Sequence, residues 1–182
     1  AKSTACLQFL PQVSQPSRAL ERGDADVLII PADFMSPDHP REFLYEEGFV
    51  CLVWRESALA LGELTIDRYT NAGHAVVQPG YGYIEALDGW LLNRFGIQRR
   101  ILVSTFSFIA LPVLVIGTEL VATVHSRVAH RLVGVWPLEI RPMPMKFEKM
   151  GQSVQWHKLR TNDPELMWLR GMLTQAAQLI DL

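Results

Sequence analysis

The stretch from residue 153 to residue 170 constrains the fold more than any other part of this sequence. Residues 153–156 suit a β-strand. Asn162 or Asp163 can accept a backbone N–H as an N-cap, and Pro164 fits the first helical position, where no amide donor is needed. Apolar residues then recur at helical spacing at Leu166, Leu169, Met172 and Leu173. The stretch predicts a strand, a capped turn and a closing helix with one buried face, and an ordinary C-terminal packing helix would have the same pattern.

Composition narrows the class of protein. The chain has 182 residues, enough for one substantial domain or two small lobes, and with 49% hydrophobic and 20% charged residues it is typical of a globular protein. A net charge of −2 argues against binding a polyanion. The richest apolar stretch, 108–116, is interrupted by Pro112 and is too short to cross a membrane. With no signal peptide at its start, and with Cys6 and Cys51 expected to be buried thiols, the chain is predicted to be cytoplasmic.

Strand and helix segments alternate along the chain. We expect strands at 6–9, 25–31, 43–45, 49–54, 74–77, 100–103, 120–124 and 152–157. We expect helices at 16–22, 66–70, 84–95, 106–115 and 127–132. Residues 138–145 are interrupted by prolines, which favours an edge strand or an extended connector. Residues 27–30 are apolar without interruption, as in a strand covered on both faces. The sequence therefore predicts an α/β fold with mostly parallel sheets.

Motifs for catalysis, metals and cofactors are missing. The sequence has no GxSxG, GxxxxGK[ST], HExxH or GxGxxG motif, so we expect no catalytic residue and no cofactor. His125 and His130 are five residues apart across a strand-to-helix junction, a poor spacing for a shared metal, and surface or capping roles are expected for both. His39 lies between prolines and is expected to be solvated. No metal site is predicted.

Two strand-to-helix loops are candidates for ligand binding. Residues 104–108 combine hydroxyls and aromatic rings where a helix is expected to begin, which suits a small aromatic ligand with a phenolate, carboxylate or carbonyl edge. The alternative is a helix cap at Ser104 or Thr105 beside core phenylalanines. The glycine-rich loop 78–83 could let a ligand approach the backbone. It lacks the third glycine of a phosphate-binding loop, so phosphate binding is not expected there. Both loops would open at the carboxyl edge of a parallel sheet, where α/β folds bind ligands.

An ordered set of short segments carries a family likeness across nearly the whole chain. They are LERGDADVLIIP at 20–31, FVCLVWR at 49–55, FGIQRR at 95–100, FIA at 108–110, LVATV at 120–124, QWH at 155–157, NDP at 162–164 and MWLR at 167–170. Together they resemble the effector-binding domain of LysR-type transcriptional regulators. The likeness is to the branch whose members respond to flavonoids in nodulation, or to nitroaromatic, salicylate or chlorinated aromatic compounds.

This resemblance implies a fold and a site. It implies two α/β lobes like those of periplasmic binding proteins, joined by two crossover strands, with lobe I at 1–54 plus 155–182 and lobe II at 55–154. The implied effector-binding residues are Tyr81, Gly82, Tyr83, Thr105, Phe106, Ser107, Phe34, Met35 and Trp156. Related regulators of aromatic acids carry histidines where Tyr81 and Ser107 stand, so we expect a bulkier and less charged effector of the phenol, chlorophenol, nitroaromatic or flavonoid type.

The resemblance also implies partners. The family's helix-turn-helix is absent from this sequence, so DNA and RNA polymerase would be partners of a full-length protein, as a homodimer or homotetramer. The first strand and helix of lobe I are also missing, which makes that lobe N-terminally incomplete and residues 6–9 a surface for strand pairing. We expect no membrane association. The alternatives are an α/β enzyme that cleaves small aromatic esters with Ser107 and His125, and a solute-binding protein of similar shape.

Overall fold

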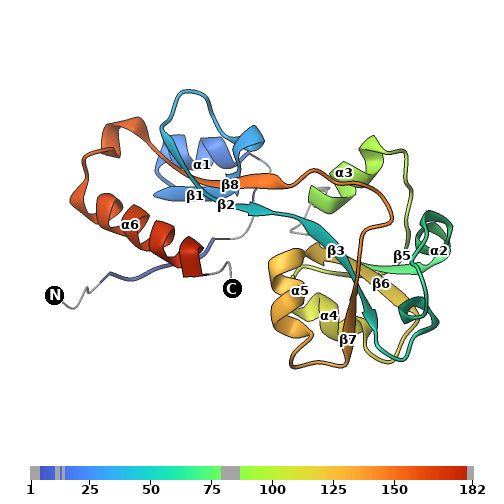
Figure 1. Cartoon of the computed structure of the whole chain (residues 1–182). Helices are drawn as coiled ribbons and strands as arrows, with labels where there is room; N and C mark the ends of the chain where they lie inside the picture. Colours follow the sequence, from blue (N-terminus) through green and yellow to red (C-terminus); the bar gives the residue numbers. More distant parts are fainter. Residues whose placement is uncertain (1–4, 11–12, 14, 79–86, 180–182) are drawn as a thin grey trace.

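Two β-sheets form the centres of two lobes (Figure 1). The computed structural model describes residues 5–10, 13, 15–78 and 87–179. The first sheet has the order β1-β8-β2 and consists of β1 (Val27–Pro31), β8 (Met150–Trp156) and β2 (Arg41–Glu47). The second has the order β5-β4-β6-β3-β7 and consists of β5 (Arg100–Thr105), β4 (Gly73–Val77), β6 (Leu120–His125), β3 (Phe49–Trp54) and β7 (Leu138–Arg141).

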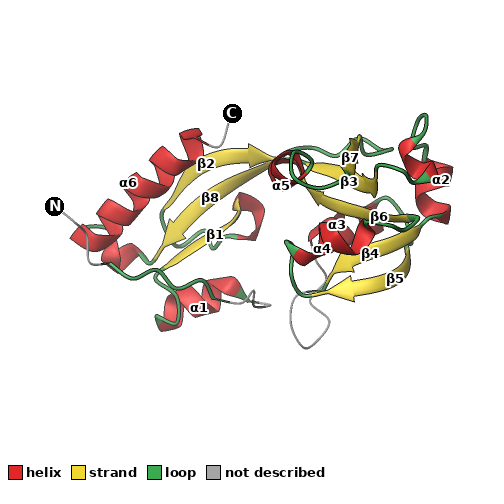
Figure 2. Ribbon diagram, turned by 90° about the horizontal axis from the view of Figure 1, so that it is seen from below, coloured by secondary structure: helices red, strands yellow, loops and turns green. Residues whose placement is uncertain are grey.

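Helices cover both faces of each sheet. In the first lobe, α1 (Pro16–Arg22) and α6 (Pro164–Leu179) lie on opposite sides of the sheet (Figures 1 and 2). In the second lobe, α2 (Ile66–Asn71) and α3 (Leu87–Arg94) pack into one apolar cluster, and α4 (Ala110–Val115) and α5 (Ser126–Leu132) pack into the cluster on the other face. Three short 3₁₀ helices complete the described elements: η1 (Ala32–Phe34), η2 (Ala58–Ala60) and η3 (Lys158–Arg160).

The sheets are not mostly parallel, so that prediction is wrong. The first sheet is entirely antiparallel. In the second, β4 runs parallel to β5 and β6, whereas β3 runs antiparallel to β6 and β7. Strands β2 and β8 lead to and from the second lobe and pair without the helical crossover that a parallel pair requires. The uninterrupted apolar run in β1 belongs to an edge strand, and Ile29 is 40% exposed rather than covered.

The chain passes between the lobes earlier than the sequence predicted. The boundary was expected after Trp54, where the polarity changes, but β3 belongs to the second sheet and its Cys51, Leu52 and Val53 are fully buried there. The first crossing therefore falls at Gly48, between β2 and β3. On the return, the whole of β8 lies in the first sheet, so that crossing precedes Met150 rather than residue 155.

Local predictions were better than long-range ones. Gly23 ends α1 with φ 74°, and Thr65 caps α2 by accepting the Arg68 N–H at 3.3 Å, both as expected. Four local predictions were wrong: residues 6–9 form no strand, Cys6 is exposed, His39 is buried, and α4 begins at Ala110 rather than at residue 106.

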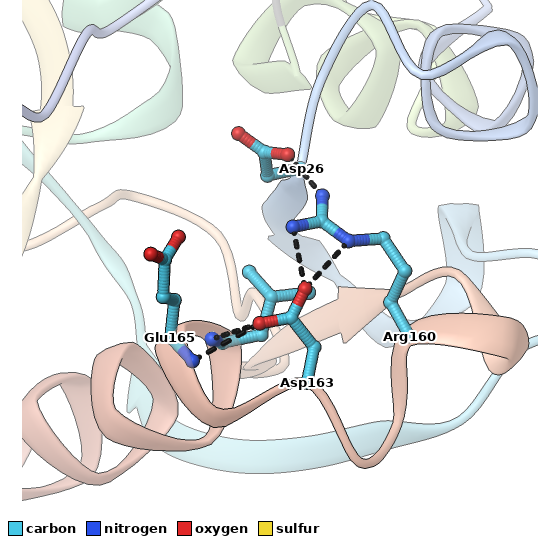
Figure 3. A network of polar contacts seen from close by, with 5 residues as sticks. Asp26, Arg160, Asp163 and Glu165 are labelled. Atoms are coloured by element: carbon cyan, nitrogen blue, oxygen red, sulfur yellow. Dashed lines mark hydrogen bonds and ion pairs between the residues drawn. The ribbon is translucent and has the colours of Figure 1, made fainter.

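Asp163, rather than Asn162, caps the closing helix (Figure 3). Its Oδ1 accepts the backbone N–H groups of Glu165 at 3.0 Å and Leu166 at 3.3 Å. Its Oδ2 accepts from Arg160, whose Nη2 is 2.8 Å away, and Arg160 also pairs with Asp26 at the start of the first sheet. Arg160 therefore ties the beginning of α6 to β1, and both the guanidinium and the backbone N–H groups lower the pKa of Asp163.

Candidate functional site

The parallel strands of the second lobe end at one edge of its sheet. Because β4 runs parallel to β5 and β6, the terminal residues Val77, Thr105 and His125 lie at the same edge. The arrowheads of β4 and β5 point toward the first lobe in Figure 2. The first crossing also reaches this edge, since Phe49 is the first residue of β3 and pairs with His125. Ligands of α/β sheets bind at such carboxyl edges, so this edge is the candidate site.

Two hydroxyl groups shape the turn from β5 into α4. Thr105 Oγ1 accepts the Ser107 N–H at 3.2 Å, and Ser107 Oγ accepts the Ala110 N–H at 3.3 Å. The alternative of a cap at Ser104 or Thr105 beside core phenylalanines is therefore wrong in its residues, because Ser107 accepts the N–H at the start of α4 and both Phe106 and Phe108 are exposed. Neither hydroxyl donates its own proton to another described residue, so each keeps an O–H donor at the edge. Between them, the Phe106 side chain is 83% exposed.

His125 is the residue of this edge that the sequence analysis underrated. Its ring stacks on Phe49, with centroids 4.8 Å apart and planes at 25°, and lies 5.8 Å from the Phe108 ring on a tilt of 39°. Its Nδ1 is buried and has no hydrogen-bond partner among the described residues. The available signal was its position directly after the predicted strand 120–124, at the same edge as the two candidate loops.

Burial also fixes the charge state of His125. Loss of solvent around the ring lowers the pKa of His125, and the nearby carboxylates of Glu47 and Asp88 oppose that shift without reversing it. The imidazole is therefore neutral at neutral pH. A neutral imidazole has one nitrogen that donates and one that accepts.

A buried carboxylate connects the two lobes beside this edge. Glu47, the last residue of β2, accepts the Ser126 hydroxyl at 2.7 Å and the Gly48 N–H at 3.0 Å. Its other oxygen lies 3.8 Å from Nε of Arg127. The Arg127 guanidinium is 4.6 Å from the centroid of the Tyr45 ring. We call Glu47, Ser126 and Arg127 the crossing clamp, because they join β2 of the first lobe to α5 of the second.

The remaining predicted site residues fall in three places. Tyr81, Gly82 and Tyr83 lie outside the described residues. Phe34, which is 42% exposed, ends η1 directly after β1, and Met35, which is buried, follows it.

Trp156 lies in the core of the first lobe rather than at the edge. It is 3% exposed, packs with Val154 and Leu166, and donates from Nε1 to Thr161 Oγ1 at 3.2 Å. The Arg170 guanidinium lies 3.9 Å from the Trp156 ring centroid. These contacts give Trp156 a packing role beneath α6.

Two surface hollows lie away from the candidate edge. One of about 660 Å³ opens beside the beginning of α6, and one of about 280 Å³ lies between α3 and β5. Neither is lined by a predicted effector residue. Within the described ranges, no three histidine, cysteine or acidic side chains gather into a possible metal site. None of the helices in those ranges combines the length and apolar character needed to span a bilayer.

The fold and its edge define a class: a two-lobed α/β binding domain with its candidate site beside the crossings between the lobes. The family model described as "LysR substrate binding domain" matches residues 8–178. The chain therefore belongs to the LysR substrate-binding domain family, the regulatory part of transcriptional regulators, and it is not an enzyme domain. This assignment removes the alternative of an ester-cleaving enzyme built on Ser107 and His125.

Relatives in sequence and structure agree with this family. The chain is 37% identical to Nodulation protein D 1 of Rhizobium tropici over 96% of its own length and 57% of the relative, and 34% identical to Nodulation protein D 1 of Bradyrhizobium japonicum over 96% and 54%. It thus spans about half the length of these relatives.

Solved structures share the fold. The regulatory domain of MexT, a transcriptional activator of Pseudomonas aeruginosa, superposes with a TM-score of 0.71 at 24% identity, covering 88% of this chain and 76% of that one. The regulatory domain of MetR, a LysR family regulator from N. meningitidis, gives 0.73 at 14% identity, covering 93% and 77%.

Proposed function

We propose that this domain senses a small aromatic effector at the carboxyl edge of the second-lobe sheet. The observation that carries the proposal is that hydroxyl donors, exposed aromatic rings and a buried imidazole meet at that edge, beside the crossing to the first lobe. The similarity to relatives named nodulation protein D supports this proposal, because the sequence resembles regulators that respond to aromatic compounds in nodulation. The effector class is the one expected from the sequence: phenols, chlorophenols, nitroaromatics or flavonoids.

The proposed contacts come from both lobes. Thr105 and Ser107 donate hydrogen bonds from their hydroxyls, and Phe106 covers the aromatic ring of the effector. Contacts from Tyr81, Gly82 and Tyr83 stay a prediction from the sequence, because these residues lie outside the described ranges. Phe34 and Met35 face the effector from the first lobe.

The effector would act by changing the balance between two arrangements of the lobes. A ligand shifts such a balance only if it binds one arrangement more tightly than the other. A site beside the crossings meets this condition, because its shape depends on both lobes. In the full-length cytoplasmic regulator, a homodimer or homotetramer, the shift would reach DNA through a helix-turn-helix and affect RNA polymerase.

Thermal unfolding of the purified domain tests this function. Ligand at about a hundred times its Kd stabilises a protein by about 2.7 kcal/mol, which raises the Tm of a domain of this size by about 5–11 °C. We expect such a shift from members of a panel of phenols, chlorophenols, nitroaromatics and flavonoids. If no member of the panel stabilises the domain, the proposed function is wrong.

A pair of variants tests the location of the site. Phe106→Ala should keep the Tm of the free domain, because the side chain is 83% exposed, but should lose most of the ligand-induced shift. The matched control is Leu159→Ala, since Leu159 is 84% exposed and lies on the first lobe next to α6. An undiminished ligand shift in Phe106→Ala would place the effector elsewhere.

A further inference from the structure

The His125 ring contacts two aromatic rings at the candidate edge. Phe49 comes from the strand that leaves the crossing, and Phe108 comes from the turn between β5 and α4. His125 is also the residue immediately before α5. Its orientation is therefore set by three separate elements, and an imidazole held in this way is already oriented for a directional hydrogen bond.

One nitrogen of this ring lacks a partner. Nδ1 of His125 is buried, and no described residue hydrogen-bonds to it. A buried polar atom without a partner costs about 1–3 kcal/mol, so such atoms are rare in native structures. A water molecule, an ion or a ligand can supply the missing partner of such an atom. The position of this one, at the carboxyl edge, is where a ligand would supply that group.

The surrounding charges restrict what the ligand can be. The carboxylates of Glu47 and Asp88 both act on the His125 ring. Each carboxylate already has an arginine partner: Arg127 lies 3.8 Å from Glu47, and Arg99 lies 2.5 Å from Asp88. An anionic ligand would therefore find no unpaired positive charge among these groups. A neutral hydroxyl group does not need a positive charge as its partner.

We infer that His125 Nδ1 accepts a hydrogen bond from a hydroxyl group of the aromatic effector, whose ring packs at the edge beside Phe49 and Phe108. The inference rests on the proposed function and makes it narrower. It selects hydroxylated aromatics over nitroaromatics and over carboxylates, which cannot donate a proton when ionised. His125 becomes a specificity-determining residue, with no covalent step.

A ligand pair isolates this hydrogen bond. Apigenin carries free hydroxyls, and its fully methylated ether keeps the same rings but has no donor. A hydrogen bond of this kind contributes about 1 kcal/mol, so the wild-type domain should bind apigenin about fivefold more tightly than the ether by calorimetry.

Three variants assign the preference to His125. His125→Phe keeps an aromatic ring between Phe49 and Phe108 but removes the acceptor, so it should bind apigenin and the ether alike. His125→Asn offers a side-chain carbonyl and should restore part of the preference. His130→Phe changes an exposed residue of α5 and should behave as wild type. Circular dichroism checks that each variant is folded. If His125→Phe does not fold, the comparison of His125→Asn with the wild type provides the test.

The outcomes separate the inference from the proposed function. Equal binding of apigenin and its ether by the wild type, or an unchanged preference in His125→Phe and His125→Asn, overturns the inference while aromatic binding stands. Stabilisation by nitroaromatics but not by apigenin also overturns it. If no aromatic compound binds at all, the proposed function fails first.

Discussion

Removing the Glu47 carboxylate should loosen the connection between the lobes. Glu47→Ala deletes the acceptor of the Ser126 hydroxyl at 2.7 Å and of the Gly48 N–H at 3.0 Å, and removes the 3.8 Å ion pair with Arg127. Hydrogen bonds to a charged group contribute about 1.5–3 kcal/mol each. The Gly48 N–H can bind a water molecule in place of the carboxylate. We therefore expect the free energy of unfolding to fall by about 3 kcal/mol in total.

The assay is thermal unfolding followed by circular dichroism. For a domain of this length, about 3 kcal/mol corresponds to a fall in Tm of about 6–12 °C. The neighbouring Glu46 is the matched control, because its side chain is 62% exposed and its ion pair with Lys149 spans 3.8 Å at the surface. Glu46→Ala should lower the Tm by about 2 °C or less. Glu47→Gln keeps one acceptor oxygen, so its Tm should lie between the Tm values of Glu46→Ala and Glu47→Ala.

Equal Tm values for the Glu46 and Glu47 variants would refute this reasoning. That result would mean that water replaces the contacts of the crossing clamp at no cost in stability. The clamp could then play no part in transmitting an effector signal.

Three further changes test the packing and the caps. Burial lowers the pKa of His74 to about 4 from an ordinary 6.5, so the unfolded chain takes up a proton at a higher pH than the folded domain. The contribution of His74 to stability is therefore full above pH 6.5 and is lost as the pH falls toward 4. His74→Gln should flatten the dependence of the Tm on pH in that window. A Cβ on Gly73 would lie 2.5 Å from Leu102 Cδ1, so Gly73→Ala should cost about 1–3 kcal/mol in urea unfolding, whereas Gly134→Ala, with open space around it, should not. Asp163→Ala should lower the Tm and Asn162→Ala should not, because Asp163 alone accepts the first N–H groups of α6.

Elements with local signals could be predicted from the sequence. Gly23 and Thr65 mark helix ends through backbone conformation and a short-range hydrogen bond, and both were placed correctly. Pro164 placed the start of α6 for the same reason. The direction of strand pairing has no local signal. An apolar run such as that of β1 fits a parallel or an antiparallel neighbour, and only the path of the chain decides between them.

The lobe boundary was missed for a related reason. The change in polarity after Trp54 is real, but it marks the end of a buried strand rather than the end of a lobe. The true crossing, at Gly48, falls between two strands of opposite sheets and has almost no compositional signal. Which sheet a strand joins depends on residues far away in sequence, here His125 and its neighbours in β6.

The site was predicted in part. Thr105, Phe106 and Ser107 were placed at a strand-to-helix turn, where the structure has them, because the pattern of hydroxyls and rings is local. Trp156 was expected at the site but lies in the core, whereas His125 was expected at the surface but lies half-buried at the candidate edge. Strand periodicity tells that alternate residues face opposite sides, but not which side meets a helix. In the structure Trp156 packs beneath α6, and His125 is the last residue of β6.

The proposed hydrogen bond and the crossing clamp are adjacent in the chain. His125 is followed directly by Ser126, whose hydroxyl binds Glu47 of the first lobe, and then by Arg127, which lies over the Tyr45 ring. An effector that moved the His125 backbone would therefore act on the clamp through one peptide unit, with no long pathway of contacts between the two. The same adjacency predicts that Glu47→Ala alters effector affinity as well as stability. The effector and the crossing clamp both act on the balance between the arrangements of the lobes, so removing the clamp changes the affinity for the effector.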